Sequence, residues 1–153
     1  MSLDLDYFGK PGKYLASRGW KIVPFDGLRG TAACSAYNKQ ILVKPSVFAK
    51  PNLRVRKYVI PHEIWHGIHY EVNKYAVTEI VLERGIDRRS AIEVVADGAC
   101  LRSDRSRSMR LWVSASVVWH GKVGYRYTIS DIKSPSAITA IDILNNAVEA
   151  DSV

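Results

Sequence analysis

The chain contains four histidines, and three of them fall in one short segment, at His62, His66 and His69. His62 and His66 are four residues apart, so on a helix both imidazoles project from one face at neighbouring turns and can bind a single metal ion. Glu63 follows the first histidine, where its carboxylate can reach a water molecule in an open coordination position of that ion. This H-E-x-x-H pattern predicts a metal site in which Glu63 acts as a general base.

A catalytic zinc site usually takes three protein ligands and leaves the fourth position to water, so another ligand is expected on a separate element. Glu93 is the favoured third ligand, because it stands near the start of a predicted helix and has Asp97 four residues later on the same face. Asp97 is expected to accept the second N–H of a ligand histidine and so fix its tautomer. Glu71, Glu79 and Glu83 remain alternative third ligands.

Two predicted helices must carry these residues. Apolar residues at helical spacing predict a helix over residues 55–73, with Ile64 and Trp65 facing the protein interior. Because Pro61 has no N–H to donate within a helix, the part that carries the histidines is expected to begin late, with Pro61 in its first turn. Ser90, followed three residues later by Glu93, predicts a capping box that opens a helix ending near residue 102.

The remaining pattern predicts an α+β fold. Residues 6–17 predict an N-terminal helix, and residues 20–25, 31–37 and 41–45 predict a small, mostly antiparallel three-stranded sheet whose second and third strands form a hairpin. Further helices are expected at residues 77–84 and 137–148, whereas residues 111–119 fit either a strand or a helix. At this length and 47% hydrophobic residues, we expect residues 1–153 to form a single domain with one core.

The motif residues resemble a known family. H-E-I-W-H at residues 62–66 followed by E-V-V-A-D at residues 93–97 is similar to the gluzincin arrangement of zincin metallopeptidases. The closer similarity is to the short ImmA/IrrE-type zincins of phages, mobile elements and stress regulators. Those proteins have the same order of a strand hairpin, a basic stretch, H-E-x-x-H and an E-x-x-A-[N/D] helix, over roughly residues 30–102 of this chain.

This resemblance implies a minimal zincin that binds Zn²⁺ through His62, His66 and Glu93 and hydrolyses peptide bonds with Glu63 as the base. The expected substrate is a protein or peptide, and by analogy with regulatory proteases of this type it is a cytoplasmic regulatory protein. The alternative is a non-catalytic zinc-binding regulatory or nucleic-acid-associated protein of phage or mobile-element origin.

The donor that stabilises the transition state has no motif in this sequence. His120, Tyr125 and Tyr127 are the candidates for it. His69 lies three residues after His66 and is expected to pack or to be exposed to solvent rather than to line the site.

The chain is basic, with 22 Lys and Arg against 15 Asp and Glu and a formal net charge of +7. Seven arginines gather in the middle of the chain, at Arg84, Arg88, Arg89, Arg102, Arg105, Arg107 and Arg110. They fit a solvated surface better than a phosphate-binding patch, and Trp112 and Trp119 are expected to pack in the core, so a nucleic-acid partner is not favoured. No apolar stretch approaches the ~20 residues of a membrane span, no signal-peptide pattern is visible, and the two cysteines have no paired spacing, so we expect a cytoplasmic protein without a membrane partner.

Overall fold

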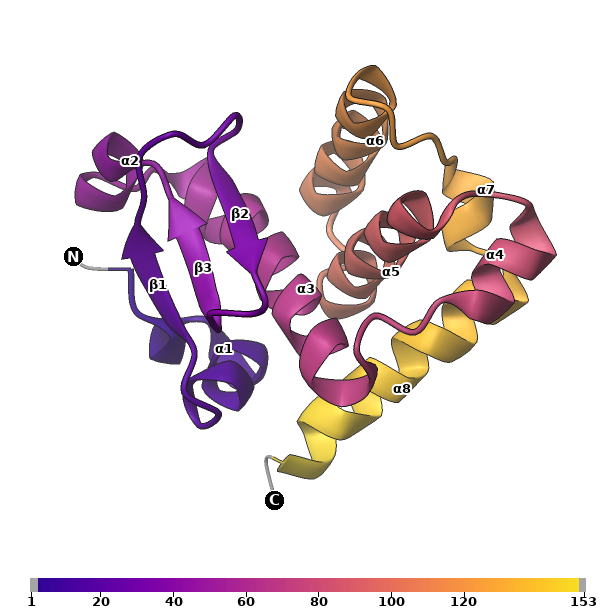
Figure 1. Ribbon diagram of the computed structural model, residues 1–153, viewed down its shortest axis with the longest axis horizontal. Helices are drawn as coiled ribbons and strands as arrows, with labels where there is room; N and C mark the ends of the chain where they lie inside the picture. The colour runs from indigo at the N-terminus through magenta and orange to yellow at the C-terminus, as the bar shows by residue number, and fades with distance from the viewer. Residues whose placement is uncertain (1–2, 152–153) are drawn as a thin grey trace.

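The computed structural model describes residues 3–151 (Figure 1). The helices are α1 (Gly9–Ala16), α2 (Pro45–Ala49), α3 (Ile60–Asn73), α4 (Thr78–Arg84), α5 (Arg88–Ser103), α6 (Arg107–Lys122), α7 (Ile129–Ile132) and α8 (Pro135–Asp151). The strands are β1 (Lys21–Pro24), β2 (Ala32–Ser35) and β3 (Gln40–Val43), and a 3₁₀ turn at Leu5–Tyr7 precedes α1. The α+β class and the predicted N-terminal and C-terminal helices are confirmed, and no helix of the described residues is long and apolar enough to cross a membrane.

The sheet has the strand order β1-β3-β2. The predicted hairpin is confirmed, because β2 and β3 pair in antiparallel register, with Cys34 opposite Ile41. The expectation of a mostly antiparallel sheet is wrong, since β1 pairs with β3 in parallel. The segment after β1 leads to β2 at the opposite edge of the sheet. β3 then lies between β1 and β2 and runs parallel to β1. Strand order of this kind depends on the path of a loop, which hydrophobic periodicity does not encode.

α3 lies at the centre of the molecule, between the sheet and the other long helices (Figure 1). It packs against α1, β2, β3, α5 and α8. Its apolar residues Ile60, Ile64, Trp65 and Ile68 are all buried, which confirms the expected inward direction of Ile64 and Trp65. Contact on several sides fixes the axial position and rotation of α3, and therefore the direction of the side chains on its one open face.

The start of α3 has an unusual backbone. A π-helical turn at Val55–Val59 runs directly into the helix, and the N–H of Ile60 donates to the carbonyl of Val55. Pro61 then occupies the first turn of α3, as predicted from its missing N–H. The wider π turn and the proline together set where the regular helix begins, at Ile60, two residues before His62.

The starts of α5 and α6 are set by caps that the sequence analysis did not identify. α5 is capped by Asp87, whose side chain accepts a hydrogen bond from the N–H of Ser90, so the predicted capping box at Ser90 is wrong. Ser90 is itself buried within the first turn. The ambiguous residues 111–119 belong to α6, which Ser106 caps by accepting from the N–H of Met109.

Gly12 is required where α1 meets the turn before it. A Cβ at this position would overlap the carbonyl oxygen of Leu5 and crowd Phe8. We expect Gly12→Ala to lower the free energy of unfolding by ~1–3 kcal/mol in urea titration, although alanine is the better helix former. Gly121→Ala is the matched control, because a Cβ there meets nothing within 4 Å, and it should gain up to ~1 kcal/mol. A stabilising effect of Gly12→Ala would contradict this packing.

Candidate metal centre

Three side chains from two helices converge at the open face of α3. The Nε2 atoms of His62 and His66 lie 3.1 Å apart, and each is 3.0 Å from Oε1 of Glu93 on α5. Donor atoms that bind one zinc ion in a tetrahedron lie about 3.4 Å apart, so these three atoms need only a small outward shift to hold it. The structure therefore brings together the three residues predicted as ligands, and an N, N, O donor set suits zinc.

His120 on α6 reaches the same cluster. Its Nε2 lies 3.1 Å from Oε1 of Glu93, and one donor atom each of His62, Glu93 and His120 fall within 4.8 Å of one another. The sequence suggested His120 only as a transition-state donor, because α6 carries no ligand spacing. Its place beside Glu93 allows it either to donate to a bound oxyanion or to take the fourth ligand position.

Asp97 lies behind the cluster and is completely buried. Its Oδ1 is 2.9 Å from Nδ1 of His62, and it accepts hydrogen bonds from Ser116 and from the hydroxyl of Tyr127. Nδ1 of His120 lies 2.8 Å from the same Tyr127 hydroxyl. Burial alone would lower the pKa of His62, but the charge of Asp97 together with hydrogen bonds to Asp97, Cys100 and Glu93 raises that pKa well above its usual range. One carboxylate thus orients His62 directly and His120 through Tyr127.

Asp97→Asn tests this supporting role. We expect zinc affinity to fall ~10–100-fold in competition with a chelating dye, because residues that orient a metal ligand typically contribute that much. Saturating zinc should still load the variant. Asp26→Asn, in an exposed loop, is the control and should match the parent protein. Unchanged affinity of Asp97→Asn would show that the contact with His62 does not matter for metal binding.

The two glutamates of the site have opposite electrostatic surroundings. Burial raises the pKa of Glu63, and the neighbouring His62 and His66 offset only part of that rise. Burial would also raise the pKa of Glu93, but the charge of His66 and hydrogen bonds with His120 and His62 hold it well below its usual range. Glu93 therefore stays ionised, as a metal ligand must, whereas the raised pKa of Glu63 makes its carboxylate a stronger base.

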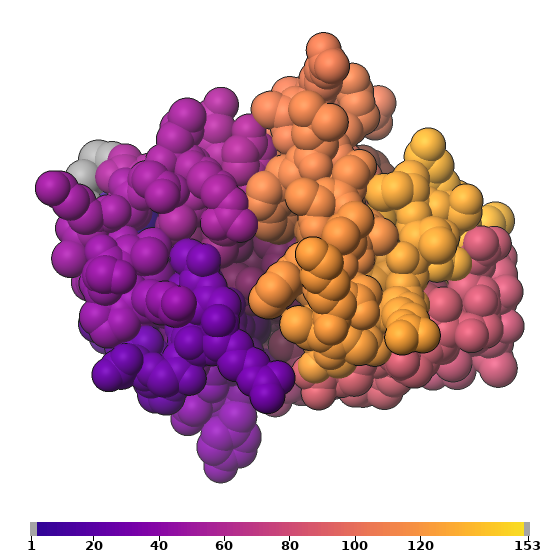
Figure 2. Space-filling model, turned by 90° about the horizontal axis from the view of Figure 1, so that it is seen from above, coloured from indigo at the N-terminus to yellow at the C-terminus, as the bar shows by residue number. Residues whose placement is uncertain are grey.

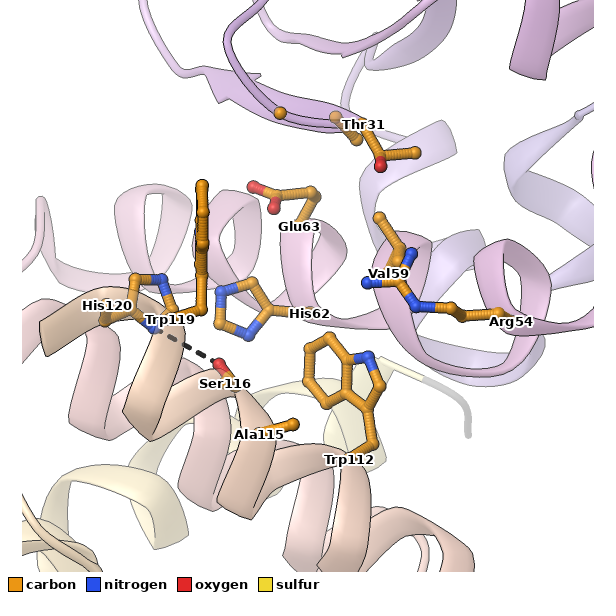
Figure 3. Close-up of a pocket in the computed structure, with 12 residues that line it drawn as sticks. Thr31, Arg54, Val59, His62, Glu63, Trp112, Ala115, Ser116, Trp119 and His120 are labelled. Carbon is orange, nitrogen blue, oxygen red and sulfur yellow. Dashed lines mark hydrogen bonds between the residues drawn. The ribbon is translucent and has the colours of Figure 1, made fainter. Parts of the chain in front are cut away.

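The cluster opens into a cleft between the sheet and α6. Two adjoining hollows of about 440 and 580 Å³ share His62, Glu63, Trp119 and His120 in their linings. Figure 2 shows the opening between the indigo and purple N-terminal part and the orange segment that contains the end of α6. In Figure 3 the Glu63 carboxylate points into the smaller hollow, between Thr31 and His62. Glu63 and the three converging side chains therefore all line space that a substrate can enter.

The two tryptophans of α6 border this cleft. Trp112 is partly buried, and its ring meets the ring of His62 edge-on at a centroid distance of 5.5 Å. Trp119 is 52% exposed and lines both hollows, so the expectation that it packs in the core is wrong. Apolar neighbours in the sequence suggested burial, but α6 is a surface helix and turns Trp119 toward the cleft.

The alternative third ligands lie elsewhere. Glu71 accepts a hydrogen bond of 2.7 Å from the indole N–H of Trp20. Glu83 accepts from the N–H of Ser136 at the start of α8, and Glu79 is exposed on α4. These acids stabilise contacts between elements or face solvent, whereas Glu93 is the acid that reaches both histidines.

The other sequence candidates have distinct places. His69 is buried and donates to the carbonyl of Ala76, and burial lowers its pKa to about 4, so the expected packing role is confirmed. Tyr127 is buried behind His120, where its hydroxyl is held by Asp97. Tyr125 lines the cleft, and its hydroxyl accepts a hydrogen bond of 2.7 Å from Arg89.

Tyr75 also lines the cleft and was missed in the sequence. It follows α3 in a left-handed backbone conformation with φ of 62°, and its hydroxyl lies 3.8 Å from Sγ of Cys34. No motif marks this position, because the turn after α3 brings it back beside His66. Cys34 and Cys100 are both free thiols, and burial raises the pKa of Cys34 to about 12.

Comparisons of the chain with family models, with curated proteins and with solved structures found no match. The similarity to ImmA/IrrE-type zincins stays a prediction from the motif residues. Any functional inference for this protein therefore depends on the geometry of the cluster and the cleft.

Proposed function

We propose that the protein is a zinc-dependent metallopeptidase that hydrolyses peptide bonds in a protein or peptide substrate. The observation that carries this proposal is the convergence of His62, His66 and Glu93 within 3.0–3.1 Å, next to a glutamate that faces a cleft. A purely structural zinc site is usually closed and lacks an adjacent base. Glu63 provides that base, and burial raises its pKa, which makes the carboxylate a stronger proton acceptor.

The division of labour follows from the positions of the side chains. His62, His66 and Glu93 would hold the zinc ion, which would supply a Lewis acid and lower the pKa of a nearby water toward about 7. Glu63 accepts the proton of the attacking water and delivers it to the leaving amine. His120 borders both hollows. Its ring N–H can donate to the oxygen of the scissile carbonyl, which becomes negatively charged when water attacks.

The walls of the cleft favour an extended peptide. β2 is an outer strand of the sheet, and its residues Ala32, Ala33 and Cys34 line the larger hollow. A peptide in extended conformation can pair with the free edge of such a strand and so cross the cleft above Glu63. Small side chains along β2 leave room for this approach. By analogy with the resembled family, we propose that the natural substrate is one or a few regulatory proteins.

A cleavage assay tests the proposal. Zinc-loaded protein is incubated with a complex mixture of proteome-derived peptides, and new termini are identified by mass spectrometry. We expect recurrent cleavage sites that disappear after treatment with a chelator and return when zinc is restored. The same mixture incubated with Glu63→Gln is the control for contaminating proteases. Identical termini from parent and variant, or none from either, would refute peptidase activity.

One observation favours a second candidate, a zinc-binding regulatory protein without catalysis. His120 lies as close to Glu93 as the ligand histidines do, so it can occupy the position that a catalytic site leaves to water. His120→Ala separates the two functions. In a peptidase this variant keeps metal affinity and loses turnover, whereas in a closed four-ligand site it loses metal affinity. The d–d absorption of the cobalt-substituted protein would report the change in ligand number.

A further inference from the structure

The last four helices of the chain are α5, α6, α7 and α8 (Figure 1). Residues of these helices and of the turns between them line a further cavity of about 560 Å³. None of the residues that line it belongs to the cleft at the metal cluster. We call it the α5–α8 cavity. Its size falls within the range of about 300–1,000 Å³ that is typical of sites for small organic ligands.

The lining of the α5–α8 cavity combines two kinds of side chain. The first group is apolar and comes from α5, α7 and α8: Leu101, Ile129, Ile132, Ile138 and Ile141. The second group is cationic: Arg102, Arg105, Arg110 and Lys133. No Asp or Glu is among the lining residues in the described part of the chain. An apolar cavity with several cations suits a ligand that has an apolar body and an anionic end.

Part of the positive charge at the rim is not neutralised. Arg102 forms an ion pair with Asp142, and the guanidinium of Arg110 donates to the backbone carbonyl of Arg105. Within residues 3–151, Arg105, Arg110 and Lys133 have no carboxylate within ion-pair distance. An incoming carboxylate or phosphate can therefore pair with these cations without breaking an existing ion pair.

The wall also depends on Gly98 of α5, which faces α8. A Cβ at Gly98 would overlap the side chain of Ile141 and crowd Ile132. The glycine thus lets Ile141 and Ile132 pack directly against the α5 backbone while they line the cavity. Ile138, one turn before Ile141 on α8, is 48% exposed although it is a large apolar residue. Ile132 and Ile141 are buried, so the apolar floor of the cavity is formed by their packed side chains together with the half-exposed Ile138.

We propose that the α5–α8 cavity is a binding site for a small anionic amphiphile, a molecule with one alkyl chain and a carboxylate or phosphate head group. The alkyl chain packs on the isoleucines, and the head group pairs with Arg105, Arg110 and Lys133 at the rim. A concave cavity of this volume fits a small molecule better than the flatter contact that a folded protein partner makes. This site is separate from the metal cluster, so it does not rest on the proposed peptidase function.

Calorimetric titration with decanoate below its micelle concentration tests the site. We expect one decanoate per chain, and binding of decyltrimethylammonium, which has the same chain length and the opposite charge, weaker by roughly tenfold or more. Equal affinity for the two probes would overturn the charge argument. Binding to vesicles that contain anionic lipid without binding of decanoate would overturn a small-molecule site in favour of a membrane surface.

Matched variants locate the binding. Ile138→Trp fills the cavity and should weaken decanoate at least roughly tenfold. Ile143→Trp on the same helix is its control, because Ile143 is 47% exposed and lies outside the cavity. Retained decanoate binding in Ile138→Trp, or equal loss in both variants, would overturn the assignment.

A charge-reversal pair tests the rim. Arg105→Glu combined with Lys133→Glu should weaken decanoate roughly tenfold or more. Lys21→Glu combined with Lys50→Glu changes the net charge equally at exposed positions in the N-terminal part of the chain, outside the cavity. This control should keep decanoate affinity within about twofold of the parent, since distant surface charges are largely screened by salt. Equal weakening by the two pairs would mean that net charge, rather than the cavity rim, attracts the ligand.

Discussion

Glu63→Gln is expected to retain zinc and the native fold while its peptidase activity falls by ~10²–10⁴-fold, the range typical of losing a general base. Glutamine keeps the size of the side chain and one oxygen, but its amide accepts no proton from water at neutral pH. Because the ligand atoms come from His62, His66 and Glu93, the metal should stay bound without the Glu63 carboxylate. The effect should therefore appear in kcat rather than in zinc content.

Measurement of zinc per chain and of cleavage rate on the same preparation separates these effects. Glu79→Gln is the matched control, because Glu79 is exposed on α4 and lies outside the cleft. It should equal the parent in both measurements. Loss of zinc from Glu63→Gln would mean that Glu63 coordinates the metal, and full activity would mean that another group takes the proton.

Much of the candidate site could be predicted because it is encoded by local periodicity. His62 and His66 share a face of α3, and Glu93 and Asp97 share a face of α5, so a spacing of four residues was enough to pair them. The existence of both helices also follows from apolar spacing. Packing of α3 against α5 then brings the two faces together. The spacing of apolar residues in the two helices is compatible with this packing but does not dictate it.

His120 could not be assigned in the same way. It reaches Glu93 only because the loop after α5 turns α6 back along the cluster, and that turn has no signature in the sequence. Trp119 and Tyr75 also face the cleft through tertiary placement. The parallel pairing of β1 with β3 was missed for a related reason, since strand order follows from chain path. Residues that share one helix face, and the two helices that carry the ligands, were therefore predictable, whereas the placement of α6, Tyr75 and β1 needed the structure.

The second substitution with a large expected effect, here on zinc affinity, is His62→Ala. We expect His62→Ala to lose zinc, with a drop in affinity greater than the roughly 10–100-fold cost of losing a residue that only orients a ligand. His62 supplies one donor atom of the cluster directly, and its Nδ1 side is the one that Asp97 orients. Removing the imidazole leaves two protein ligands and also leaves the buried Asp97 without one of its partners.

Loss of the contact between His62 and the buried Asp97 can destabilise the fold, so the effect on metal binding must be separated from the effect on stability. His69→Ala is the matched control, because His69 is also buried on α3 but bonds to the carbonyl of Ala76 outside the cluster. Thermal unfolding with and without added zinc distinguishes the two variants, since a ligand that binds only the native state raises Tm. His69→Ala should unfold at lower temperature than the parent but still gain Tm with zinc. His62→Ala should gain none, and a zinc-dependent rise equal to that of the parent would show that the metal is held by other residues.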